Sequence, residues 1–106
     1  MKQELMSDIN AKIAISLNKL LEASRSLRPS RNNEEDIANS YNKIALNADI
    51  RKATVSDTFN GKSVPTTVTL ILIVEGMGYK LSDFALIYES IKEIEIKEFQ
   101  KSKKQN

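Results

Sequence analysis

Residues 44–84 read IALNADIRKATVSDTFNGKSVPTTVTLILIVEGMGYKLSDF, and this stretch decides the fold. Its apolar residues recur at helical spacing in short blocks, and residues that favour turns separate the blocks. Asp49 follows the first block, Asn60 and Gly61 follow the second, and Gly78 follows the third. Because Gly accepts a positive φ without steric cost, Gly61 and Gly78 are expected to end helices. The stretch therefore predicts short helices joined by tight turns.

The same periodicity extends to both ends of the chain and predicts an all-α fold in one domain, residues 1–106. The expected helices are residues 3–27, 34–48, 52–59, 67–77 and 82–100. Thr66 and Ser82 are the expected N-caps of the last two helices. The apolar run TVTLILIV, residues 67–74, also suits a buried strand, but the Thr66 cap and the Gly78 stop favour a helix.

A series of small and apolar residues at fixed spacing defines a motif within residues 37–84. Its members are Ile44-Ala45, Ala48 and Ile50; Thr54-Val55-Ser56; Asn60-Gly61-Lys62 and Pro65; Met77-Gly78; and Leu81 and Phe84. This series resembles the helix-turn-helix domain of the lambda-repressor-like, xenobiotic-response-element family of DNA-binding proteins. The resemblance implies a compact five-helix domain. The apolar periodicity of this chain adds extended terminal helices, residues 3–27 and 82–100. The chain departs from the family pattern at Arg51, because the family usually has Ser or Thr at the start of the recognition helix.

By position, the resemblance makes residues 51–60 the recognition helix, which enters the major groove of double-stranded DNA. The implied base-facing residues are Arg51, Lys52, Ala53, Ser56 and Asp57. The implied phosphate contacts are Ser40, Tyr41, Thr54, Asn60 and Lys62. The chemistry suits these roles, since Arg or Lys can donate to guanine, Asp can accept from cytosine, and Ala can touch a thymine methyl group. A solvated basic face is the alternative interpretation of Arg51, Lys52 and Lys62.

Composition argues against several other classes of protein. The chain has no Cys and no His, so the commonest zinc ligands and general base are missing, and we expect no enzyme, metal site or cofactor. The sequence shows no apolar run long enough for a membrane and no signal peptide, which predicts a cytoplasmic protein without a membrane partner. The net charge of +2 is too small to indicate nucleic-acid binding by itself, so that prediction has to rest on where the charges are placed.

The two terminal helices carry more apolar surface than the motif needs. They can pack on each other or on a second copy, and we favour a homodimer through the terminal helices because symmetric dimers suit palindromic DNA sites. The favoured function is a sequence-specific transcriptional regulator that acts as a repressor. The alternative is a protein–protein interaction module, an antitoxin or an adaptor, whose terminal helices bind a protein partner.

Overall fold

The computed structural model describes residues 3–25 and 33–104. These residues form six helices: α1 Gln3–Arg25, α2 Asn33–Ala48, α3 Lys52–Phe59, α4 Thr67–Gly76, α5 Leu81–Ser90 and α6 Glu93–Lys104. The all-α prediction is confirmed for this part of the chain, in which no strand occurs, so residues 67–74 are helical. The last two residues expected in the first helix, 26 and 27, lie outside the described residues.

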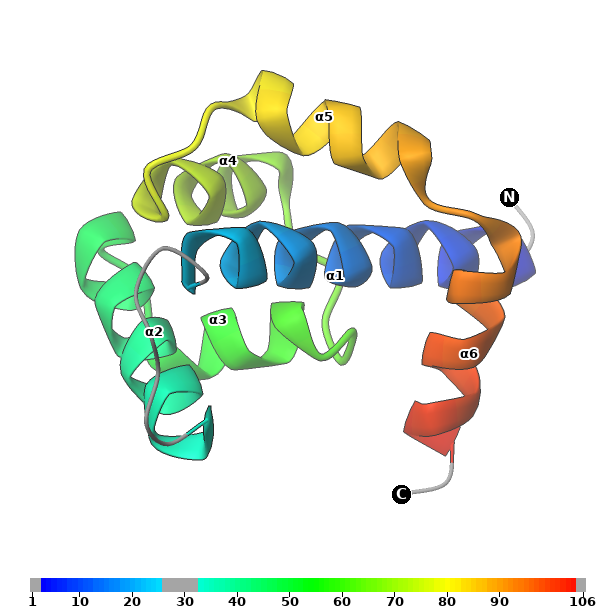
Figure 1. Ribbon diagram of the computed structural model, residues 1–106, viewed down its shortest axis with the longest axis horizontal. Helices are drawn as coiled ribbons and strands as arrows, with labels where there is room; N and C mark the ends of the chain where they lie inside the picture. The colour runs from blue at the N-terminus through cyan, green and yellow to red at the C-terminus, as the bar shows by residue number, and fades with distance from the viewer. Residues whose placement is uncertain (1–2, 26–32, 105–106) are drawn as a thin grey trace.

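Helix α1 runs through the middle of the molecule, and the other helices surround it (Figure 1). Helix α3 lies along one side of α1, α5 lies along the opposite side, and α6 crosses its N-terminal end. Helix α2 packs against both α3 and α4 at the other end of the molecule. This arrangement leaves one long side of α3 directed away from the rest of the protein.

The main core forms where the apolar face of α1 meets α2, α3, α4 and α5. Its central side chains are fully buried or nearly so: Leu17, Leu20, Val55, Phe59, Ile73 and Val74 are each at most 2% exposed. Burial of such side chains is the dominant favourable contribution to folding. The apolar run of residues 67–74 is only partly buried: Ile73 and Val74 are buried, Leu70 and Ile71 are half-buried, and Val68 is 66% exposed. Val68 lies in the first turn of α4, beyond the edge of the core.

A tight turn and a close helix crossing fix α2 against α3 and α4. Asp49 has φ 58° in the turn between α2 and α3, as its turn-forming side chain predicts. Gly76 lets α2 and α4 cross closely, because a Cβ atom there would lie 3.3 Å from the Ile44 carbonyl oxygen. Asn47 Nδ2 also donates to the Gly76 carbonyl at 3.0 Å, so the end of α4 is tied to the end of α2.

The single helix expected over residues 82–100 is wrong. The chain leaves the helical conformation at Ile91, where φ is −66° and ψ is 129°, and α6 starts at Glu93. The carboxylate of Glu95 accepts a hydrogen bond from the Lys92 backbone N–H at 2.9 Å and caps the new helix. The bend allows Ile91 and Ile96 to bury against Ala11 and Ile15 of α1, which form a second small core.

Two smaller expectations at the C-terminal part also fail. Ser82 is not the N-cap of α5, since the helix begins at Leu81 and the Asp83 carboxylate accepts from the Lys80 N–H at 2.8 Å. Residues 101–104 lie beyond the expected helix end at residue 100, but they continue α6 as far as Lys104. The first difference arises because the Asp83 carboxylate, rather than the Ser82 hydroxyl, caps the start of α5.

Candidate nucleic-acid interface

The inner face of α3 anchors the helix to the core. Val55, Thr58 and Phe59 are 0%, 1% and 1% exposed, and the Phe59 ring packs against the Tyr41 ring of α2 with centroids 5.0 Å apart. The buried Thr58 hydroxyl is satisfied because it donates to the Thr54 carbonyl at 2.7 Å. These contacts fix both the rotation of α3 about its axis and the direction in which its outer face points.

The outer face of α3 presents the residues expected to face bases. Arg51, Lys52 and Ala53 are exposed, while Ser56 and Asp57 are half-buried. Arg51 is the extended residue before the first helical turn, with φ −74° and ψ 145°, and its side chain makes no capping bond. Within the described residues, neither Arg51 nor Lys52 forms an ion pair, so both cations face solvent at the start of the helix.

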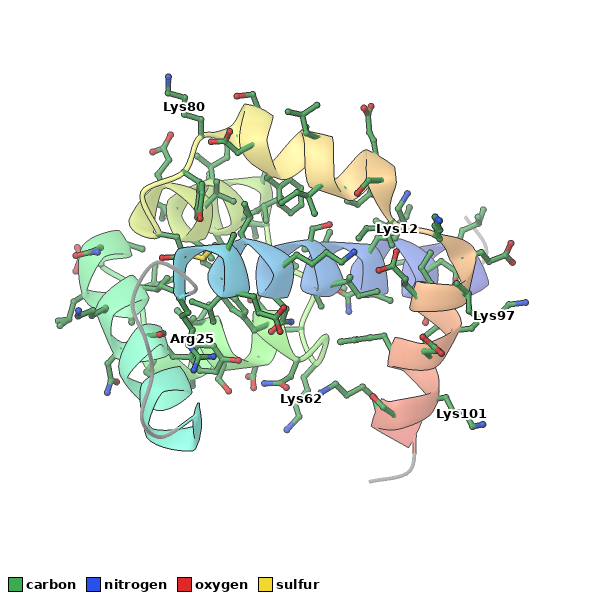
Figure 2. The ribbon with its side chains drawn as sticks, viewed as in Figure 1. Lys12, Arg25, Lys62, Lys80, Lys97 and Lys101 are labelled. Atoms are coloured by element: carbon green, nitrogen blue, oxygen red, sulfur yellow. The ribbon has the colours of Figure 1, made fainter. Side chains whose placement is uncertain are left out.

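Side chains of α1 hold the turn that follows α3. Asn18 Nδ2 donates to the Phe59 carbonyl at 2.8 Å, and Asn10 Nδ2 donates to the Gly61 carbonyl at 2.9 Å. The Lys62 N–H donates to the Asp57 carbonyl at 2.8 Å and closes the turn, in which Gly61 has φ 71°. As expected, the Asn60-Gly61 pair ends the helix. The exposed Lys62 therefore extends from a turn whose backbone is fixed (Figure 2).

The amide of Asn60 is already engaged within the protein. Its Nδ2 donates to the Ser56 carbonyl at 2.8 Å, and its Oδ1 accepts from Lys103 Nζ of α6 at 3.0 Å. The ring of Phe99, also on α6, lies against Gly61, where a Cβ atom would be only 3.0 Å from the Phe99 Cε2 atom. Helix α6 thus reaches the turn after α3, which no local pattern in the sequence predicts.

The expected phosphate contacts on α2 and α3 lie around the same helix. Ser40, Tyr41 and Thr54 are half-buried. Burial raises the pKa of the Tyr41 phenol above its ordinary value. A phenol of ordinary pKa is already a neutral hydrogen-bond donor at physiological pH. The ring contact with Phe59 brings Tyr41 to the end of α3, whereas Arg51 and Lys52 lie at its start.

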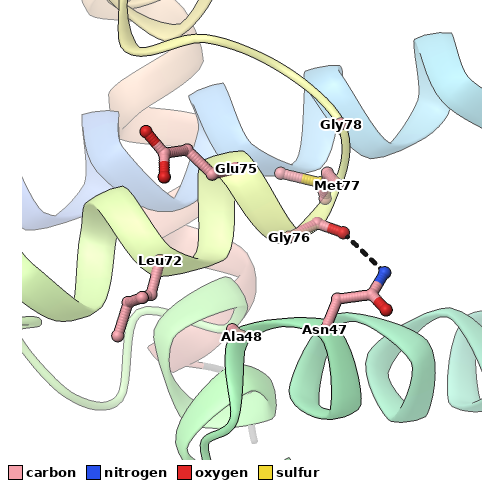
Figure 3. A pocket seen from close by; sticks show the side chains of 7 residues that line it. All are labelled: Asn47, Ala48, Leu72, Glu75, Gly76, Met77 and Gly78. Carbon is pink, nitrogen blue, oxygen red and sulfur yellow. Dashed lines mark hydrogen bonds between the residues drawn. The ribbon is translucent and has the colours of Figure 1, made fainter.

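Two hollows in the surface have different surroundings. One, about 340 Å³, lies where α2 and α4 end and is lined by Asn47, Leu72, Glu75 and Gly76 among others (Figure 3). Its lining residues belong to the close crossing of α2 and α4, so the hollow results from how these two helices pack. The other, about 390 Å³, lies between α1, the end of α3 and α6, with Asn60, Phe99 and Lys103 in its lining. The second hollow therefore adjoins the turn after α3.

Sequence reasoning missed the side chains that position this turn. Asn10 and Asn18 are amides eight residues apart on the apolar side of α1, which is a detectable signal for a polar contact inside the fold. Phe99 and Lys103 carry no comparable signal, because their partners lie about 40 residues away in sequence.

None of the helices in the described part of the chain combines the length and the apolar character that a membrane crossing needs. In the same residues, no three acidic side chains are grouped so that they could hold a metal ion. No known family model matches the chain, and neither a curated protein nor a solved structure is significantly similar to it.

Proposed function

We propose that this protein is a sequence-specific, double-stranded DNA-binding regulator that places α3 in the major groove in the manner of lambda-repressor-like domains. The observation that carries the proposal is the two-sided character of α3. On its inner face, Val55, Thr58 and Phe59 are buried in the core. On its outer face, Arg51, Lys52 and Ala53 are exposed to solvent. A major groove admits one α-helix, whose N-terminal side chains then reach base edges.

The positive charges at the two ends of α3 support this role. Arg51 and Lys52 stand at the N-terminal end of α3 and Lys62 stands beyond its C-terminal end. Cations at both ends of a groove-binding helix suit the DNA backbone, which crosses the helix on either side of the groove. Ser56 and Asp57 on the outer face add hydrogen-bonding groups that distinguish one base pair from another. Repression of transcription is the regulatory outcome we propose, since a small domain bound at a promoter blocks other proteins.

The test is selection from a pool of random-sequence duplexes, followed by sequencing of the bound fraction at two salt concentrations. We expect enrichment of a defined site and an affinity that falls steeply as the salt concentration rises. The double variant Lys52→Ala/Ser56→Ala should lose at least about tenfold in affinity for the selected site, because each good base contact contributes roughly 1–3 kcal/mol of discrimination.

Lys80→Ala is the matched control for the loss of positive charge. Lys80 is exposed at the start of α5, on the side of the molecule opposite Lys62 (Figure 2), so this variant should bind as the wild type does. Absence of any enriched sequence, with no duplex binding at low salt, would contradict the proposal. The interaction-module alternative would then be tested by asking whether the variant that lacks Lys52 and Ser56 still binds a protein partner.

A further inference from the structure

We propose that α6 is part of the DNA-binding surface, with Lys103 contacting the phosphate backbone beside Asn60 and Lys62. This inference rests on the proposed function and extends it to a helix that lies outside the motif of residues 37–84. The residues concerned are far apart in sequence, but Lys103 Nζ lies 3.0 Å from Asn60 Oδ1. Asn60 and Lys62 are the turn residues that directly follow α3.

The position of Lys103 is fixed by several contacts. Its ammonium lies 5.2 Å from the centroid of the Phe99 ring, and that ring packs against Gly61. The turn itself is held from the other side by Asn10 and Asn18. A phosphate bound here would meet donors that are already in place, so little side-chain entropy would be lost on binding.

The charge of Lys103 is available to an anion. Its bonded partner is the neutral amide of Asn60, and among the described side chains, those of residues 5–25 and 40–103, no carboxylate pairs with Lys103 or Lys62. An ammonium has three N–H donors, so Lys103 keeps two after it donates to Asn60. The side chain is exposed, which allows a DNA phosphate to approach it.

A purely structural role for Lys103 is the competing interpretation. In that case it would only attach α6 to the turn, and its loss would lower the melting temperature without changing the electrostatic part of DNA binding. The two roles differ in one measurable quantity, the slope of log affinity against log salt concentration, because that slope counts the cations that contact phosphates.

The experiment compares the full-length wild type with Lys103→Ala, Lys103→Arg and Lys101→Ala, each titrated with the same selected duplex and with a scrambled duplex at several salt concentrations. Lys101 is the matched control, since it is exposed on the same helix and points away from the turn (Figure 2). For Lys103→Ala we expect a loss of about fivefold for both duplexes and a slope smaller by about one. Lys103→Arg should keep the slope, and Lys101→Ala should behave as the wild type.

Each alternative result has a definite meaning. If the wild type binds duplex steeply but Lys103→Ala keeps the wild-type slope, the α6 contact is wrong while the proposed function stands. An equal reduction for Lys101→Ala would also overturn the specific role of Lys103, since the effect would then be one of net charge. If the wild type binds no duplex at low salt, the proposed function fails and this inference fails with it.

Discussion

Val55 is the position on which the orientation of α3 depends most directly. It is 0% exposed and belongs to the main core, so a carboxylate there has neither water nor a cationic partner. Val55→Asp should destabilise the protein by at least about 3 kcal/mol, because an unpaired charge is costly to bury. Thermal unfolding followed by circular dichroism measures the effect.

Lys52→Asp is the control for this prediction. It places the same acidic side chain on the same helix, three residues earlier, at an exposed position. We expect this variant to melt close to the wild-type temperature, since a surface change away from specific contacts costs little. Equal melting temperatures for Val55→Asp and the wild type would show that the outer and inner faces of α3 are assigned the wrong way round.

Among the helices, the bend between α5 and α6 depends on Glu95. Its carboxylate caps α6 through the Lys92 N–H at 2.9 Å and pairs with Lys19 of α1 at 2.6 Å. The bond from Lys19, followed by that from Lys92, lowers the pKa of Glu95 below 4.5. A carboxyl group whose pKa is lower in the folded than in the unfolded state stabilises the fold above its unfolded pKa, and this contribution disappears as the pH falls through the folded value.

Glu95→Gln should therefore make the protein less stable at neutral pH and should remove part of its acid sensitivity. The difference in melting temperature between wild type and variant should be largest at neutral pH and should shrink on acidification from roughly pH 5 to pH 3. We expect a modest effect, since the Glu95 side chain is 29% exposed. Glu98→Gln, on an exposed residue of the same helix, is the control. A constant difference across this pH range would contradict the assigned role of Glu95.

The helices differ in how far local sequence predicts them. For α3, the expected and observed bounds coincide at Lys52 and Phe59, because Asp49 and Gly61 adopt the positive φ angles that their residue types favour. The bend at Ile91 has no such local signal, since neither Pro nor Gly occurs in residues 82–100. It is stabilised by tertiary burial of Ile91 and Ile96 against α1, and short-range periodicity cannot detect a contact of that kind.

The same distinction applies to the candidate site. The buried side of α3 was predictable because helical periodicity places Val55 and Phe59 on one face. The hydrogen bond from Lys103 of α6 to Asn60 was not predictable, since it joins positions 43 residues apart. Local patterns therefore identify the helix that we propose reads DNA, whereas the position of the turn beyond it depends on contacts with α1 and α6.

For the molecule as a whole, packing between the ends of the chain changes the basis of the expected dimer. Ile91 and Ile96 are 8% exposed because they pack on Ala11 and Ile15, so part of the surplus apolar surface is covered within one chain. What stays exposed at the start of α1 is Leu5 at 53%, Met6 at 49% and Ile9 at 39%. Ile9 follows Leu5 by four residues and Met6 by three, so both neighbour it on one side of the helix. The dimer prediction now concerns this face.

We expect the wild type to sediment as a dimer, with twice the 11.9 kDa mass of one chain. Met6→Glu should sediment as a monomer, because dimerisation would bury its new charge between two copies. Leu46→Glu is the control, since Leu46 is 81% exposed on α2, outside the terminal helices. A monomeric wild type, or a dimer that Leu46→Glu alone dissociates, would exclude this face.

If the prediction holds, two copies of α3 related by a two-fold axis would require half-sites about 34 Å apart, one turn of DNA. Met6→Glu should then lose the preference for two-fold symmetric sites while it keeps binding to single half-sites.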